Sequence, residues 1–184
     1  MNAMPIHLLT ISGSLRSGAS NTALLDAVRL VSPRGVEIKS YEGLAGLPPF
    51  NPDLDTVDGK KLPSAAADLR ARVGWADGLF ISSPEYAHGI PGAFKNALDW
   101  LVGSVEFPGK AVALLSASPR AIYVQAQLTE VLTTMNARIV AGASVTLSLP
   151  SRTHDAAAIA ADPALCEVLR NAVAALVRDI AKHG

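Results

Sequence analysis

Residues 81–100 read ISSPEYAHGIPGAFKNALDW and combine the end of a strand, a loop and the start of a helix. The apolar run before this stretch stops at small hydroxyl residues, and a loop with Pro, Glu, Tyr and Gly follows. Pro91 is typical of the first turn of a helix, which we expect over residues 93–101. In an open α/β sheet, ligands bind in the loops at the carboxyl ends of strands. We therefore expect residues 83–89 to form part of a ligand site.

The composition is that of a globular protein. The chain has 184 residues, of which 49% are hydrophobic and 17% charged. This length predicts a single domain over residues 1–184. Lys plus Arg and Asp plus Glu both number 16, so no basic surface for nucleic acid is expected. The lone cysteine, Cys166, excludes an internal disulfide and a cysteine-based metal cluster.

The sequence predicts no association with a membrane. No apolar run approaches the roughly 20 residues that span a bilayer. Residues 1–5 lack a basic region followed by an apolar stretch, so we expect no secretory signal. A cytoplasmic protein is the resulting expectation.

Strand-like and helix-like segments alternate along the chain. The expected strands are residues 6–11, 36–40, 78–82, 110–115 and 138–147. The expected helices are residues 20–31, 65–73, 93–101, 122–135 and 156–182, the last with a break at Asp162-Pro163. A long loop covers residues 44–63. This alternation requires a parallel sheet with helices on both faces.

The position of the polar loops predicts where a ligand would bind. Five parallel strands allow a flavodoxin-like three-layer sandwich with strand order 2-1-3-4-5, whose ligand crevice lies between the first and third strands. The two loops richest in functional groups, residues 12–21 and 83–89, follow those two strands. We therefore expect both loops to contribute to one site.

The first of these loops has the composition of a phosphate site. Residues 12–22 read SGSLRSGASNT, between a strand and a helix start. A helix N-terminus offers unpaired N–H groups and a partial positive charge to an anion. Glycine allows close backbone approach, and Arg16 can add a forked, charge-assisted hydrogen bond. The candidate phosphate ligands are Ser14, Arg16, Ser20, Asn21 and Thr22.

Other interpretations of this loop were weighed. Gly13 to Ser20 has the spacing of a Walker A loop, but Ala19 stands where that loop needs lysine. Gly13 and Gly18 cannot supply a dinucleotide fingerprint. Ser20 or Asn21 could simply cap the helix, a role that is compatible with phosphate binding nearby.

The composition of the second loop is typical of a binding site for a flat ring. Glu85 and Tyr86 could suggest acid–base chemistry, but no Ser-His-carboxylate arrangement or Gly-x-Ser-x-Gly elbow occurs. His88 lacks a second ligand at metal spacing, so a metal site is not expected. Tyr86 could serve packing alone, or the loop could present a platform with backbone donors to a heteroaromatic ring.

Both loops resemble those of a known family. Gly13-Ser14-Leu15-Arg16 followed by Asn21 is similar to the FMN-phosphate loop of the NAD(P)H-dependent FMN reductases, a flavodoxin-like group that includes quinone, chromate and azo-dye reductases. Pro84-Glu85-Tyr86 is similar to the loop that lines the flavin ring there. The similarity continues through residues 91–100 and is strongest in the first two loops.

The resemblance assigns further flavin contacts and also shows departures. It implies ring contacts by Pro84, Glu85, Tyr86, Ala87, His88 and Gly89, and by Ser118 in a third loop. Where relatives often have Ser and Asn, this chain has Ala19 and Ala87. The third loop, residues 116–120, lacks the glycines common in relatives, and Pro119 removes a donor. Arg120 is left open as a contact to the dinucleotide phosphate, a subunit contact or a solvated side chain.

The function that the resemblance implies is a flavin-dependent oxidoreductase. It would hold FMN without a covalent bond, take a hydride from NADPH or NADH, and pass electrons to a small-molecule electron acceptor such as a quinone, flavin or azo compound in a ping-pong cycle. No catalytic side chain is expected, and relatives imply a homodimer or homotetramer. The alternatives are a non-enzymatic flavin-binding electron carrier or sensor, and a hydrolase or nucleotide-binding module. The balanced net charge weakens the carrier interpretation.

Overall fold

A parallel sheet forms the middle layer of the protein. The computed structural model describes residues 5–56, 59–149 and 155–183, so the predicted absence of a secretory signal, which concerns the first residues, falls largely outside the described part. The strands are β1 (Ile6–Ser12), β2 (Val36–Tyr41), β3 (Gly78–Ser82), β4 (Ala111–Ser116), β5 (Arg138–Ile139) and β6 (Val145–Thr146). They follow the order β2-β1-β3-β4-β5, with β6 also paired to β4. The flavodoxin-like order is therefore confirmed.

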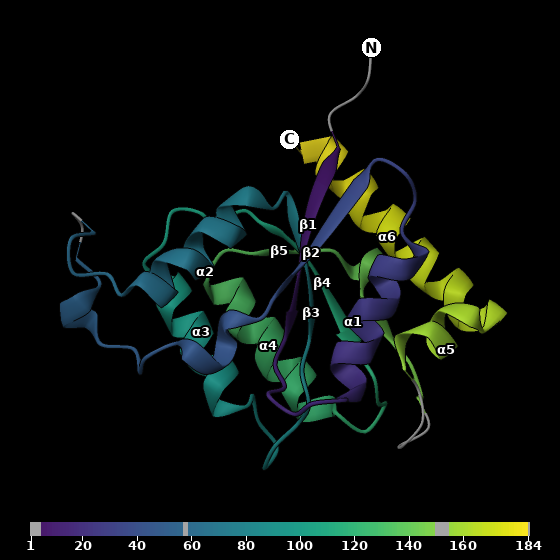
Figure 1. Cartoon of the computed structure of the whole chain (residues 1–184), viewed down its shortest axis with the longest axis horizontal. Helices are drawn as coiled ribbons and strands as arrows, with labels where there is room; N and C mark the ends of the chain where they lie inside the picture. Colours follow the sequence, from purple (N-terminus) through teal and green to yellow (C-terminus); the bar gives the residue numbers. More distant parts are fainter. Residues whose placement is uncertain (1–4, 57–58, 150–154, 184) are drawn as a thin grey trace.

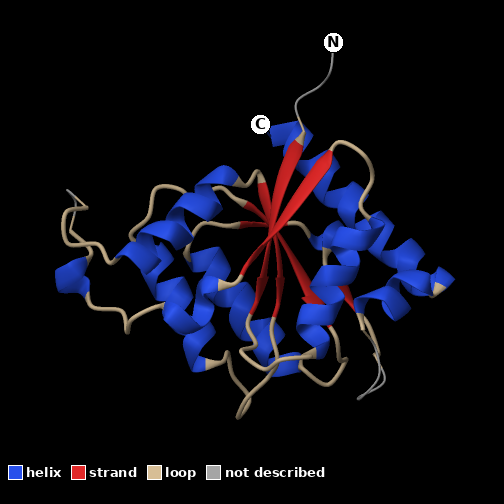
Figure 2. Cartoon of the chain, in the orientation of Figure 1, coloured by secondary structure: helices blue, strands red, loops and turns tan. Residues whose placement is uncertain are grey.

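Helices cover both faces of this sheet, as predicted (Figure 1, Figure 2). They are α1 (Ser20–Val31), α2 (Ser64–Trp75), α3 (Gly92–Val102), α4 (Ile122–Thr134), α5 (Ala156–Ala161) and α6 (Pro163–His183). Short 3₁₀ turns lie at η1 (Gly43–Gly46), η2 (Pro52–Leu54) and η3 (Ala141–Ala143). In Figure 1, α2, α3 and α4 lie on one side of the sheet, and α1, α5 and α6 lie on the other.

Alternating side chains of the central strands form two separate cores. Leu79 and Ile81 of β3 pack into the core beneath α2, α3 and α4, whereas Phe80 packs into the core beneath α1 and α6. All three are buried. Strands buried on both faces read as continuous apolar runs, which is the pattern that these segments show in the sequence.

The predicted fifth strand is wrong as a single element. Instead of one strand over residues 138–147, the structure has β5, the turn η3 and β6, and both short strands pair with β4. The physical reason lies at Ser144, whose Oγ accepts a hydrogen bond from Leu114 N–H over 3.0 Å. A side chain thus replaces a backbone partner in the middle of the ladder. The chain then returns to β4, where Leu147 N–H donates to Ser116 O.

The last helical segment divides where the sequence predicts. Asp162 ends α5, and Pro163 begins α6. The Asp162 carboxylate accepts hydrogen bonds from Ala164 N–H and Leu165 N–H, which satisfies the first turn of α6. None of the helices in the described ranges combines the length and apolar character needed to cross a bilayer. The prediction that residues 1–184 form one domain stays a prediction.

The long loop over residues 44–63, in the part that is described, is anchored to α3. Asn96 donates from Nδ2 to Pro48 O and accepts at Oδ1 from Phe50 N–H. Trp100 Nε1 donates to the same Pro48 carbonyl over 2.8 Å. These side chains of the 91–100 segment therefore hold structure and do not face a ligand.

Candidate functional site

The carboxyl ends of three neighbouring strands meet at one edge of the sheet. In the parallel register, Ser12 of β1 lies beside Ser82 of β3, and Ser82 lies beside Leu115 of β4. Gly13 N–H donates to Ser82 O over 2.8 Å, which ties the first loop to the end of β3. We call residues 13–19 loop 1, residues 83–91 loop 2 and residues 117–121 loop 3.

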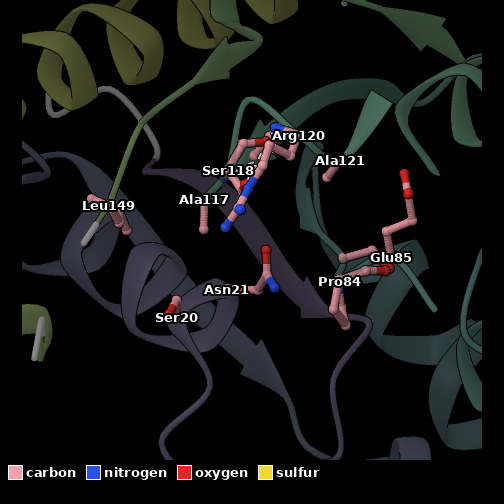
Figure 3. A pocket seen from close by; sticks show the side chains of 11 residues that line it. Ser20, Asn21, Pro84, Glu85, Ala117, Ser118, Arg120, Ala121 and Leu149 are labelled. Carbon is pink, nitrogen blue, oxygen red and sulfur yellow. Dashed lines mark hydrogen bonds between the residues drawn. The ribbon is translucent and has the colours of Figure 1, made fainter. Parts of the chain in front are cut away.

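A cavity of about 380 Å³ opens between these elements (Figure 3). Its lining residues come from the start of α1, loops 2 and 3, the end of β4 and the segment after β6. They are Ser20, Asn21, Ser83, Pro84, Glu85, Ser116, Ala117, Ser118, Arg120, Ala121 and Leu149. The cavity lies at the switch between β1 and β3, where open α/β sheets bind ligands.

The cavity gathers only part of the predicted site. The predicted residues that line it are Ser20, Asn21, Pro84, Glu85 and Ser118. The predicted residues outside its lining are Ser14, Arg16, Thr22, Tyr86, Ala87, His88 and Gly89. Sequence reasoning did not assign Ser83, Ser116, Ala117, Ala121 or Leu149, although the expected end of the fourth strand could have pointed to Ser116 and Ala117. The roles of the predicted residues toward a ligand remain predictions.

Polar side chains within and beside loop 1 hold the loop itself. Ser12 Oγ and Thr22 Oγ1 share a hydrogen bond of 2.8 Å, and Ser12 Oγ also accepts from Ser14 N–H. Ser14 Oγ in turn accepts from Arg16 N–H. Arg16 is exposed to solvent. Gly13 is required by space, because a Cβ there would lie 2.5 Å from Ser83 Oγ.

The N-terminus of α1 is open. Its N-cap is Ala19, in extended conformation (φ −69°, ψ 136°), and no side chain caps the helix. The first helical hydrogen bond runs from Ala23 N–H to Ala19 O, so the three preceding N–H groups have no acceptor among the described residues. The capping interpretation is wrong, because the helix begins at Ser20 and Asn21 Oδ1 instead accepts from Ser82 Oγ. Such an end attracts an anion.

A side chain caps the N-terminus of α4. Tyr123 N–H and Val124 N–H donate to Glu85 Oε2 over 2.9 and 3.0 Å. Figure 3 shows the Glu85 side chain directed away from Asn21. Although Glu85 lines the cavity, its carboxylate therefore serves α4, a partner far along the chain.

Loop 2 closes in a tight hairpin. Tyr86 and Gly89 exchange two backbone hydrogen bonds, of 3.2 and 3.0 Å. Ala87 and His88 between them have φ angles of 48° and 59°, as in a two-residue type I′ turn. Within the described ranges, no acceptor meets the N–H groups of Glu85, Ala87 and His88. The loop therefore offers three backbone donors, and one of these residues, Glu85, lines the cavity.

Loop 3 contributes a cationic side chain to the lining of the cavity. Arg120 lines it, and Figure 3 shows its side chain extending across the opening toward Asn21. The backbone of the loop turns in on itself, because Ser118 Oγ accepts from Arg120 N–H. No described acceptor lies within hydrogen-bonding distance of the Arg120 guanidinium. Its charge is thus available to a ligand.

The groups with shifted pKa lie away from the cavity. Burial, together with the nearby Asp68 carboxylate, raises the pKa of Tyr41 to about 12. Burial lowers the pKa of Lys110, whose Nζ donates to Ala76 O. Neither Tyr41 nor Lys110 lines the cavity. The arrangement suits the binding of an anionic, partly planar molecule better than acid–base catalysis by side chains.

The sheet order and the cavity at its switch point define a flavodoxin-like α/β protein. The family model for NADPH-dependent FMN reductases matches residues 6–150. The chain belongs to this family.

Individual relatives agree with this assignment. The chain is 40% identical over 116 residues to an NAD(P)H-dependent FMN reductase of Pseudomonas aeruginosa and 30% identical over 115 residues to a quinone reductase of Escherichia coli. Each match covers 61% of this chain and 60% of the relative's length. Among solved structures, a flavoenzyme NAD(P)H:acceptor oxidoreductase from Paracoccus denitrificans superposes with a TM-score of 0.77 at 26% identity, covering 97% of this chain and 99% of that one.

Proposed function

We propose that this protein is an NAD(P)H-dependent oxidoreductase that binds FMN noncovalently and reduces quinones, flavins, azo compounds or similar small acceptors. The observation that carries the proposal is the open N-terminus of α1 beside a cavity at the β1/β3 switch. Its relatives include an NAD(P)H-dependent FMN reductase and a quinone reductase. The matches span about 60% of the length of those relatives, and the activity of this chain is therefore a proposal.

The donor set around the cavity fits the phosphate of FMN. The unpartnered N–H groups of Ser20, Asn21 and Thr22 would donate hydrogen bonds to the phosphate oxygens at the positive end of the α1 dipole. Ser82 Oγ donates to Asn21 Oδ1, and the Asn21 side-chain N–H₂ has no acceptor among the residues that the structure describes. Arg120 would add a cation from loop 3.

Loop 2 fits the flavin ring. The N–H groups of Glu85, Ala87 and His88 would face the polar edge of the ring, and Pro84 would support it. The Glu85 carboxylate is held at α4, which keeps its negative charge off the ring. When bound, FMN supplies hydride acceptance from the nicotinamide and electron delivery to the acceptor. The chain's own residues bind and orient, and none has to act as a base.

A cytoplasmic location and a homodimer or homotetramer complete the proposal. Large apolar side chains near the cavity support contact between subunits, because Tyr86, Ile122 and Tyr123 are 55%, 61% and 48% exposed. Contiguous exposed apolar surface commonly marks an interaction site. Light scattering on the eluting protein would measure the oligomeric state, and a monomer would contradict this part.

An absorbance spectrum with anaerobic reduction tests the proposed activity. The purified protein, or the apoprotein supplied with FMN, is expected to show a flavin spectrum that NADH or NADPH bleaches in the absence of oxygen. A quinone added afterwards should restore the oxidised spectrum. A protein that takes up no FMN, or whose bound FMN is not reduced by either nucleotide, would refute the proposal.

A further inference from the structure

The side chain of Gln127, on α4, holds the backbone of loop 2 with both ends of its amide. Gln127 Oε1 accepts from Ile90 N–H over 3.1 Å, and Gln127 Nε2 donates to His88 O over 3.2 Å. The two contacts lie on either side of Gly89, where a Cβ would approach Gln127 Oε1 to 3.3 Å. Gln127 is exposed and does not line the cavity.

Two further contacts join the same helix to the same loop. The ring of His88 stacks on that of Tyr123, with centroids 4.1 Å apart and planes 19° from parallel. Glu85 accepts from the first turn of α4. Loop 2 is thus attached to α4 at its beginning, at its tip and at its end.

The turn in loop 2 needs this support because its own residues disfavour it. A type I′ turn requires positive φ at both central positions and favours Asn-Gly there. This chain has Ala87 and His88 at φ 48° and 59°. Residues with a Cβ avoid this left-handed region. The local sequence would therefore relax the turn if the tertiary contacts were removed.

We propose that Gln127 is a positioning residue that keeps the Ala87-His88 turn in the conformation in which loop 2 presents its N–H groups to the flavin ring. The inference rests on the proposed function for the identity of the ring. It assigns to Gln127 an effect on the ring site that leaves the phosphate site at α1 unchanged, because the side-chain hydrogen bonds that Gln127 makes to the described residues go to loop 2.

The first test uses the apoprotein and needs no cofactor. In Gln127→Ala, hydrogen exchange at the amides of Tyr86, Gly89 and Ile90 is expected to accelerate about tenfold, since local opening is no longer opposed. Gln125→Ala removes a glutamine from the same helix that has no hydrogen bond to loop 2, and it should leave these amides at the wild-type rate. Unchanged exchange in Gln127→Ala would overturn the inference.

The second test compares FMN with riboflavin, which lacks the phosphate. Gln127→Ala is expected to weaken both ligands by the same factor, about fivefold, the effect of losing one or two ordinary hydrogen bonds. The visible spectrum of the bound flavin should shift in the same variant. Loss confined to FMN would overturn the inference, because it would place the effect at the phosphate.

A rescue variant separates positioning from direct contact. Ala87→Gly relieves the positive φ without adding a side chain, so the double variant Ala87→Gly/Gln127→Ala should regain most of the wild-type affinity and spectrum. Failure to regain either would overturn the positioning role. A wild-type protein that binds neither flavin would refute the proposed function as a whole, whereas a binding wild type with an indistinguishable Gln127→Ala variant refutes this inference alone.

Discussion

Two helices begin at the same cavity, and they differ in whether a side chain caps their N-terminus. The first turn of α1 has Ala19 as its N-cap and leaves three N–H groups open. The first turn of α4 receives the Glu85 carboxylate on two N–H groups. Both ends carry the partial positive charge of a helix dipole, so either could attract a phosphate. The end of α4 already holds a carboxylate, so we expect an anionic ligand to bind at the end of α1.

The largest effect is expected from closing the open end. Ala19→Asp places a carboxylate at the N-cap of α1, whose backbone already has the extended conformation that capping residues adopt. The affinity for FMN should fall about a hundredfold, because the phosphate loses charged hydrogen bonds and meets a like charge. Fluorescence titration of the apoprotein measures this.

Two measurements on Ala19→Asp check the cause. Riboflavin affinity should stay at the wild-type value, and the apoprotein should gain about 1 kcal/mol in the free energy of unfolding from the new cap. Ala19→Asn, a cap without charge, should stabilise equally and weaken FMN less. If the aspartate variant lost riboflavin as severely as FMN, the phosphate would not lie at this helix end.

A smaller effect is expected from the cation across the cavity. Arg120→Gln should weaken FMN binding about tenfold, within the range for one charge-assisted hydrogen bond. Arg16→Gln should change it by less than about twofold, because Arg16 is exposed and outside the lining. The sequence predicts Arg16 as one of the phosphate ligands, so the reverse ranking of the two variants in the same titration would support that prediction.

Removing the carboxylate that caps α4 should destabilise the protein. Glu85→Ala leaves two N–H groups of α4 without their acceptor, and the free energy of unfolding is expected to fall by about 1–2 kcal/mol in urea. Glu130→Ala, an exposed carboxylate on the same helix, should stay within about 0.5 kcal/mol of the wild type. Equal stabilities of the two variants would mean that Glu85 does not cap α4.

The smallest effect concerns the turn between Tyr86 and Gly89. Ala87→Asn puts a residue that tolerates positive φ at the first central position of the turn. We expect a gain of about 0.5–1 kcal/mol in stability, measured by thermal unfolding. A loss of stability would show that the turn differs from the type I′ geometry.

The sequence predicted the layers of this fold well because they depend on local pattern. Apolar runs, alternation and helical spacing located β1 to β4, and Asp162-Pro163 marked the helix break. The fifth strand escaped prediction because its interruption depends on Ser144 bonding a residue of β4. Such a contact joins segments distant in the sequence and leaves no periodic trace.

The sequence predicts a site at the ends of β1 and β3, where the structure has the cavity, but it does not predict which side chains bond to which. Strand order placed loops 1 and 2 together, and glycine and hydroxyl content pointed to an anion at α1. The role of Glu85 could not be read, because its partners are N–H groups 38 and 39 residues further on. The sequence likewise provides no ground to prefer Arg120 over Arg16, since side-chain direction depends on tertiary structure.

The central claim is that the open end of α1 holds the phosphate of FMN. Calorimetric titration of the wild-type apoprotein with FMN and with riboflavin tests it most directly, because the two ligands differ only in that phosphate. We predict that FMN binds about a hundredfold more tightly, as expected for several charge-assisted hydrogen bonds. Equal affinities for the two flavins would contradict it.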